Sequence, residues 1–222
     1  TFLQRSYDEI SHDLARMNLN ATLLIDRAGL VGSDGDTHQG IYDSSFLYSI
    51  PNCVITMASK PSQIESLLQE SMKNHGVFAI RYTKELINKE TKTEKESIKF
   101  GEWKQLTSGE NTAIVSYGPI INDLVKEIEN KNLNVSVFEA IYVRPILLKN
   151  LEALKRYNKI VIYDVYSTEV GFTNTLIAEL IKQGYKGEIV AKTIPNEFIG
   201  HDTVSGQRES LGISIDKIID IL

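Results

Sequence analysis

The chain has 222 residues, of which 42% are hydrophobic and 24% are charged, and its formal net charge is −5. This is an ordinary globular composition, and the mixing of acidic with basic residues argues against a nucleic-acid partner. No apolar stretch approaches the roughly 20 residues that a membrane helix needs, and Cys53 is the only cysteine. We therefore expect a cytoplasmic protein with no membrane contact and no disulfide.

The first half of the chain alternates between helical and strand patterns. A helix is predicted over 2–18 and another from position 61. Between them and after them lie short apolar runs that predict strands at 21–25, 54–57 and 77–82. A polar, charged stretch from 84 to 112 then interrupts the pattern, and its core at 89–96 is expected to be solvated.

The second half repeats the alternation. Strands are predicted at 113–117, 135–138, 160–163 and 188–192, with helices from 119, over 145–157 and over 170–183. Alternating strands and helices are typical of parallel sheets covered on both faces. We therefore predict an α/β protein with two open, mostly parallel sheets flanked by helices, in two domains at 1–100 and 112–222 joined by a linker at 101–111.

One loop carries chemistry. Residues 25–40 read IDRAGLVGSDGDTHQG and directly follow the first predicted strand. Ligands of open α/β sheets bind outside the carboxyl ends of strands, and glycines let a backbone approach a ligand closely. By itself such a polar loop is more often a mobile surface segment than a site.

The string IDRAGLVGSDGDTHQG, with TFLQRSYDE before it and YDSSFLYSIPNCVI after it, closely resembles the 1-deoxy-D-xylulose 5-phosphate synthase family of the transketolase superfamily. Weaker similarity continues to the C-terminus through RYTKE, VFEAIYVRPI and IPNEFIGHDTV. The resemblance implies that 1–100 is an N-terminally incomplete pyrimidine-binding domain and 112–222 a transketolase C-terminal domain.

Members of this family condense pyruvate with D-glyceraldehyde 3-phosphate and release CO2, using thiamine diphosphate and Mg²⁺. The product serves isoprenoid, thiamine and pyridoxal synthesis. The resemblance therefore implies a transferase, those two small-molecule substrates and a homodimer.

The resemblance also implies site residues. Phe2 matches the aromatic residue that stacks on the cofactor's aminopyrimidine ring. His38 and Asp34 match the catalytic histidine and acidic residue near the reacting carbons. The positions expected to bind substrate are Arg5, Arg27 and Lys84.

The chain departs from the family pattern in two strings. Lys84 stands where the family's RYPRG string has its second arginine, so a positive charge remains but bidentate phosphate geometry is lost. The stretch 164–171 has fewer glycines than its family counterpart. Both differences indicate a divergent branch with altered substrate handling.

A third departure concerns the cofactor. In the family, the metal and diphosphate sites lie on a preceding domain, and a glutamate that activates the aminopyrimidine lies just upstream of Thr1. We therefore expect this chain to be a piece of a longer protein, to supply no metal ligand and to be inactive alone. The alternatives are another transketolase-type enzyme, a 2-oxoacid dehydrogenase β-subunit, or a non-catalytic binding or dimerisation module.

Overall fold

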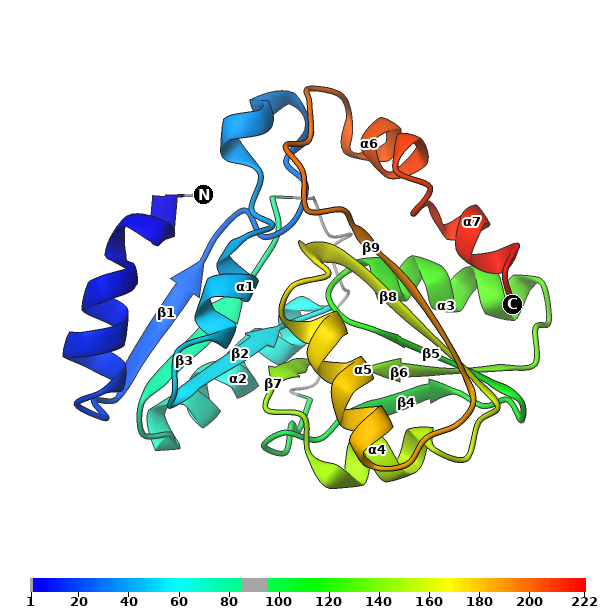
Figure 1. The fold of residues 1–222 in the computed structure, drawn as a ribbon, viewed down its shortest axis with the longest axis horizontal. Coiled ribbons are helices and arrows are strands. Elements are labelled where there is room, and N and C mark those ends of the chain that lie inside the picture. Colours follow the sequence, from blue (N-terminus) through cyan, green and yellow to red (C-terminus); the bar gives the residue numbers. More distant parts are fainter. Residues whose placement is uncertain (1, 85–95) are drawn as a thin grey trace.

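The computed structural model describes residues 2–84 and 96–222, which form two sheets side by side (Figure 1). The charged stretch at 89–96 lies almost wholly outside the described residues.

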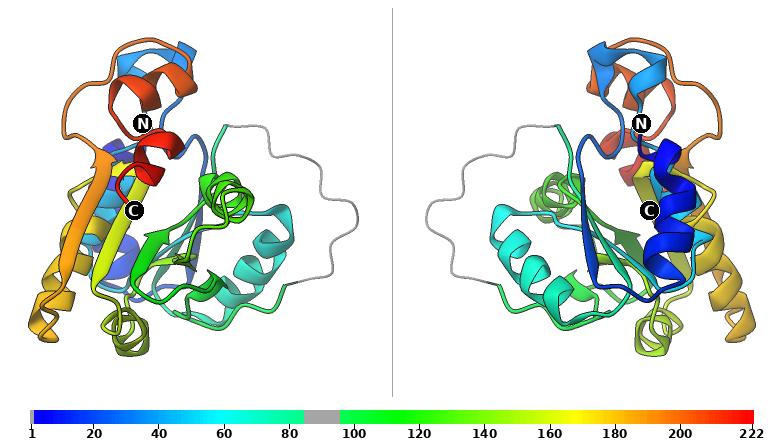
Figure 2. Two further views of the ribbon diagram at one scale, coloured as in Figure 1. Left: turned by 90° about the vertical axis from the view of Figure 1, so that its right-hand side faces the viewer. Right: turned by 90° about the vertical axis from the view of Figure 1, so that its left-hand side faces the viewer.

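The first sheet has the strand order β1-β3-β2-β7. Its strands are β1 (Ala21–Ile25), β2 (Cys53–Met57), β3 (Val77–Arg81) and β7 (Tyr142–Arg144). The first three are parallel, and β7 runs antiparallel to β2. One face is covered by α2 (Pro61–Lys73), and the other by α1 (Asp43–Tyr48) with the N-terminal turns η1 (Phe2–Ser6) and η2 (Glu9–Ala15) (Figures 1 and 2).

The second sheet has the order β4-β6-β5-β8-β9. Its strands are β4 (Lys104–Thr107), β5 (Thr112–Ser116), β6 (Val135–Glu139), β8 (Lys159–Thr168) and β9 (Glu188–Ile194), all parallel to their neighbours except β4. The helices around it are α3 (Ile120–Asn130), α4 (Leu148–Leu154), α5 (Phe172–Lys182), α6 (Val204–Ser210) and α7 (Ile215–Ile219). In Figure 2, α3 and α5 lie on opposite faces of this sheet.

The predicted fold class is confirmed: both sheets are mostly parallel and flanked by helices. Two strands cross the predicted domain bounds. β4 lies inside the predicted linker and pairs with β6, and β7 lies in the predicted second domain but pairs with β2. The N-terminal helix, predicted over 2–18, is divided into a 3-10 turn and a π-helical turn. The division into 1–100 and 112–222 stays a prediction.

The two sheets share one core. Buried apolar side chains form a continuous cluster that includes Ile25 and Ile55 of the first sheet and Ile114 and Ile162 of the second. Arg144 of β7 fastens the first sheet to α1 by donating hydrogen bonds to the carbonyls of Leu47, Tyr48 and Ile50 at 2.7–3.1 Å. The continuous cluster packs the two sheets against each other.

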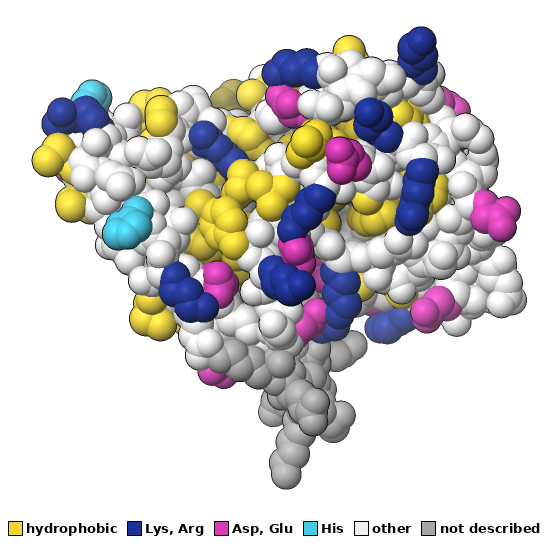
Figure 3. Space-filling model, turned by 90° about the horizontal axis from the view of Figure 1, so that it is seen from below, with side chains coloured by type: hydrophobic (Ala, Val, Ile, Leu, Met, Phe, Trp, Pro, Cys, Tyr) yellow, Lys and Arg dark blue, Asp and Glu magenta, His cyan; other side chains and the backbone are white. Residues whose placement is uncertain are grey.

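The surface mixes charges of both signs. On the face in Figure 3, Lys and Arg side chains alternate with Asp and Glu and form no single-sign patch. Among residues 2–84 and 96–222, no helix has the length and apolar character to cross a membrane.

Candidate functional site

The loop after β1 is closed at its neck by backbone contacts. Gly29 and Gly40 exchange two hydrogen bonds of 2.7 and 2.8 Å, and the Ala28 N–H donates to the Tyr82 carbonyl beyond β3. A Cβ on Gly40 would lie 1.9 Å from the Arg27 carbonyl oxygen, so only glycine fits there. The neck fixes Arg27, which itself has a left-handed φ of 59°.

The far part of the loop rests on the C-terminal segment. The Gln39 side chain is buried, accepts from the Val31 N–H at 2.9 Å and donates to the Ile199 carbonyl at 3.3 Å. Tyr42 donates to the Glu197 carbonyl at 2.9 Å. The loop and the chain leading into α6 consequently lie side by side at the top of Figure 1. The second half of the protein thus supports a loop that belongs to the first.

Three charged side chains meet beside this loop. The Asp34 carboxylate accepts from Arg27 Nη1 at 3.0 Å and from Lys84 Nζ at 2.9 Å to each oxygen. Arg27 follows β1 and Lys84 follows β3, so neighbouring parallel strands deliver the two cations to one place. The hydrogen bond from Lys84, together with the charges of Lys84, Arg27 and His38, holds the pKa of Asp34 below its usual range. Asp34 is therefore ionised at neutral pH and places a negative charge between the two cations.

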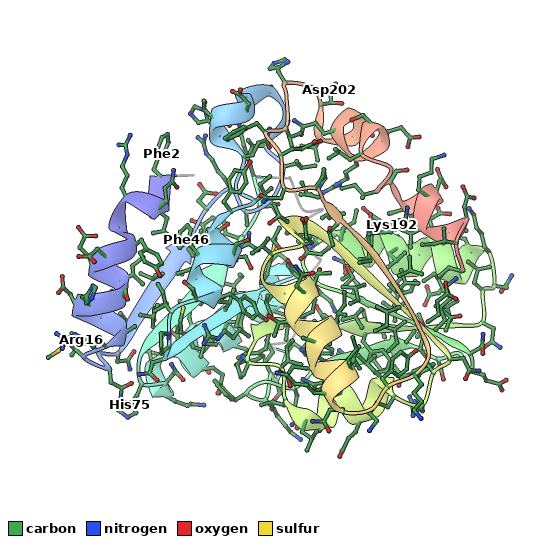
Figure 4. All side chains as sticks on the ribbon, viewed as in Figure 1. Phe2, Arg16, Phe46, His75, Lys192 and Asp202 are labelled. Carbon is green, nitrogen blue, oxygen red and sulfur yellow. The ribbon has the colours of Figure 1, made fainter. Side chains whose placement is uncertain are left out.

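Phe2, Arg5 and His38 gather at a neighbouring groove. The Phe2 ring meets the His38 ring edge-to-face at 5.6 Å between centroids, and the Arg5 guanidinium lies 5.5 Å from the Phe2 centroid. The groove has a volume of about 640 Å³ and is lined by η1, by β1 and by Arg27 and His38. Phe2 is 57% exposed although it is a large aromatic residue, and Figure 4 places it at the start of the N-terminal turns. An exposed ring at the rim of such a groove is suited to stack on a planar ligand.

All six predicted site residues therefore lie in two adjoining clusters: Phe2, Arg5 and His38 in one, and Arg27, Asp34 and Lys84 in the other. Arg27 and His38 both line the groove, which connects the clusters. Their roles remain predictions.

Sequence reasoning missed Arg81. This guanidinium is fully buried at the end of β3, donates two hydrogen bonds to Asp43 at 2.7 and 2.9 Å, and also donates to the carbonyls of Gly40 and Tyr166. Burial disfavours its charge, but the Asp43 carboxylate outweighs this and raises the pKa of Arg81 above its usual range. A charged residue at the end of a buried apolar strand needs a buried counterion. The arginine at the end of the apolar run 77–81 was therefore the sequence feature that could have indicated this pair.

Asp164 in the second sheet was also overlooked. It is fully buried, and its oxygens accept from the Tyr117 hydroxyl, the Ser167 hydroxyl and two backbone N–H groups. Burial raises the pKa of this carboxyl, while those donors oppose the rise. The network lies beside Tyr166, whose carbonyl accepts from Arg81, so it supports the junction behind the loop.

No metal centre is built from the described residues. Across 2–84 and 96–222, no three His, Cys, Asp or Glu side chains gather in a way that could hold a metal ion.

Comparison with known proteins identifies the class. Residues 1–89 match the family model of the transketolase pyrimidine-binding domain. Transketolase from Campylobacter jejuni has the same fold, with a TM-score of 0.75 and 15% identity over 99% of this chain and 34% of that one. A protein described as split gene transketolase, inactive beta4 tetramer, superposes with a TM-score of 0.84 at 18% identity, over 99% of this chain and 71% of that one. Residues 1–89 therefore belong to the transketolase pyrimidine-binding family, and the whole chain is similar to proteins of the transketolase superfamily.

Relatives with higher sequence identity indicate a narrower family. The chain is 33% identical to 1-deoxy-D-xylulose-5-phosphate synthase of Bacillus cereus strain AH820 and 36% identical to that of Listeria innocua, in each case over 99% of its own length. The resemblance inferred from the loop is thereby confirmed. The chain spans 36% of the length of each of these relatives.

Proposed function

We propose that this chain supplies the aminopyrimidine-facing and substrate-phosphate-facing walls of a thiamine-diphosphate-dependent synthase that joins pyruvate to D-glyceraldehyde 3-phosphate. The supporting observation is the convergence at the carboxyl ends of β1 and β3. There, Phe2, His38 and Arg27 line one groove, and Lys84 meets Arg27 beside it through the shared Asp34 carboxylate. The relatives' names supply the reaction, and the groove supplies chemistry that suits it.

The residues fit one part of the cofactor. The exposed face of Phe2 in a groove of about 640 Å³ is suited to a flat aminopyrimidine ring. When bound, the cofactor supplies the electron sink for decarboxylation and carbon–carbon bond formation. In this proposal, the Mg²⁺ and the diphosphate are held by another part of the enzyme, as the resemblance to the family implies.

Each side chain then has a role. His38 lies beside Phe2, and its Nδ1 is 2.9 Å from the Thr37 hydroxyl, so its ring has a fixed orientation for moving a proton to or from a substrate oxygen. Arg27 and Lys84 bind the phosphate of glyceraldehyde 3-phosphate, while Arg5 contacts substrate from η1. Asp34, being ionised, acts on the site as a negative charge.

The same proposal covers assembly. The enzyme is a cytoplasmic homodimer, and the buried, unpaired Cys53 is in keeping with a reducing compartment. Light scattering of the assembled enzyme measures its oligomeric state directly.

A product assay separates this proposal from other transketolase-type activities. The chain, assembled with the polypeptide that carries the diphosphate-binding domain, is given pyruvate, glyceraldehyde 3-phosphate, thiamine diphosphate and Mg²⁺. We expect 1-deoxy-D-xylulose 5-phosphate and CO2 in equal amounts. Ketol transfer between sugar phosphates without use of pyruvate would instead identify a transketolase, and acyl transfer to a lipoyl group a 2-oxoacid dehydrogenase.

A further inference from the structure

The two cations assigned to the substrate phosphate already have an anion between them. Asp34 contacts Lys84 Nζ with both carboxylate oxygens and Arg27 Nη1 with one, all at 2.9–3.0 Å. A carboxylate held by a guanidinium and an ammonium occupies the place that a phosphate would take between the same donors.

The exposure of the three groups is unequal. The side chains of Arg27 and Lys84 are 45% and 50% exposed, whereas that of Asp34 is 19% exposed. The cations thus remain accessible to a solute while the carboxylate lies inward between them. With Asp34 in place the three groups carry a net charge of about +1, and with Asp34 displaced the cation pair presents about +2.

The backbone that carries Asp34 is less firmly held than the neck of the loop. The turn Gly32–Asp34 is closed by long contacts, 3.5 Å from the Asp34 N–H to the Val31 carbonyl and 3.3 Å from the Gly35 N–H to the Gly32 carbonyl. The space around Gly35 is open, because a Cβ there would meet no heavy atom within 4 Å. Arg27 sits at the neck, which two short hydrogen bonds close. We therefore expect Asp34 to be displaced more easily than Arg27.

A hollow adjoins Lys84 on the side of the C-terminal segment. It has a volume of about 480 Å³ and is lined by residues 30–33, by Lys84 and by residues 201–204. In Figure 4, Asp202 from this segment lies beside the loop at the top of the view. The hollow gives room for a displaced carboxylate or for the body of a phosphate ester.

We propose that Asp34 is a tethered competitor that reserves the Arg27–Lys84 pair for a dianionic phosphate group and rejects monocarboxylates such as pyruvate. This inference rests on the proposed function, in which both substrates are anions and only one carries a phosphate. It makes Asp34 a specificity-determining residue.

The discrimination follows from charge and tethering. A carboxylate attached to the same loop has a high effective concentration at the cations, at least in the millimolar range. A free monocarboxylate offers the same chemistry without that advantage and cannot displace it. A phosphate dianion brings about twice the charge and an additional oxygen, so it can.

Calorimetric titration of the full chain with inorganic phosphate and with acetate, at fixed low ionic strength, tests this. The variants are Asp34→Asn, which keeps shape but removes charge, and Asp36→Asn, an exposed acid two residues away, as the matched control. We expect Asp34→Asn to bind phosphate about five- to tenfold more tightly, the effect of one charge at roughly 4 Å in water, and to gain acetate binding. Asp36→Asn should behave as the wild type. Circular dichroism checks that both variants remain folded.

The inference is overturned if Asp34→Asn binds phosphate no more tightly than the wild type and does not bind acetate. It is also overturned if neither the wild type nor any variant binds either anion. Adding Arg27→Gln or Lys84→Gln to Asp34→Asn should abolish the gain. If these additions leave phosphate binding unchanged, the phosphate assignment in the proposed function fails. If Arg27→Gln or Lys84→Gln weakens phosphate binding although Asp34→Asn alone does not change it, only the role of Asp34 as a competitor fails. The product assay tests the reaction independently.

Discussion

His38 depends on its immediate neighbours for its position. It ends the short turn Asp36–His38, meets Phe2 edge-to-face and lies within 2.9 Å of the Thr37 hydroxyl. These contacts hold the ring at the groove but leave it partly exposed, as a group that exchanges protons with a substrate must be.

We predict that His38→Ala in the assembled enzyme lowers kcat by about 10² to 10⁴, because a positioned acid–base group is removed. His75→Ala, at an exposed histidine on the amino-terminal side of β3, is the matched control and should keep normal turnover. Steady-state kinetics with both substrates makes the measurement. A His38→Ala enzyme with more than half of the wild-type turnover would remove His38 from the mechanism.

Gly40 allows a second test at the scale of one residue. An added methyl group would lie 1.9 Å from the Arg27 carbonyl oxygen, which is backbone and cannot rotate away. We expect Gly40→Ala to lower the free energy of unfolding by about 1–3 kcal/mol or more and to open the loop neck. Gly200→Ala, where no heavy atom lies within 4 Å and φ is not left-handed, should stay within about 0.5 kcal/mol of the wild type. Urea unfolding of both variants compares them, and equal stabilities would contradict the packing described for the neck.

At the scale of elements, Arg81 joins β3, the loop neck, α1 and β8 through one buried guanidinium. Arg81→Met leaves Asp43 buried without its counterion, so we predict a loss of about 3–5 kcal/mol in the free energy of unfolding. Lys126→Met breaks an exposed pair with Asp123 and should cost less than about 1 kcal/mol. Guanidinium chloride unfolding distinguishes the two. A similar small loss in both variants would show that the Arg81 network does not hold the halves together.

Five of the parallel strands, β1, β2, β3, β5 and β6, are predictable from the sequence because each is a short apolar run. The predicted bounds of β1 agree with the structure, and those of β2, β3, β5 and β6 differ from it by at most one residue at each end. β4 and β7 escape prediction, since Lys104–Thr107 is polar and partly exposed and Tyr142–Arg144 has three residues. The short helices α6 and α7 escape it too, because a helix of five to seven residues gives too little periodicity to detect.

The sequence proposes residues for the candidate site but does not predict how they are arranged. The loop string indicates Arg27, Asp34 and His38 through family resemblance. That Asp34 binds Lys84, fifty positions later, depends on β1 and β3 being neighbours, which no local pattern states. The Arg81–Asp43 pair is likewise a consequence of tertiary packing.

At the scale of the whole molecule, the groove beside Phe2 and His38 is lined along one side by the strand β1. Among the described strands, β1 pairs with β3 alone, and four of its residues line the groove. Edge strands are common sites of pairing with another segment. Under the proposed function, we therefore predict that another segment of the enzyme covers this edge.

The central proposal is that the active site is shared with a further part of the enzyme. Calorimetric titration of these 222 residues alone with thiamine diphosphate and Mg²⁺ tests it most directly, and a CO2-release assay with pyruvate accompanies the titration. Under the proposed function, the walls formed by this chain contact at most the ring end of the cofactor, while charged and metal-mediated contacts normally fix a diphosphate. We therefore predict no micromolar binding and no CO2 release by the chain alone, and both when the polypeptide with the diphosphate-binding domain is added. Micromolar cofactor binding or metal-dependent decarboxylation by the isolated chain would show instead that the active site is complete without that polypeptide.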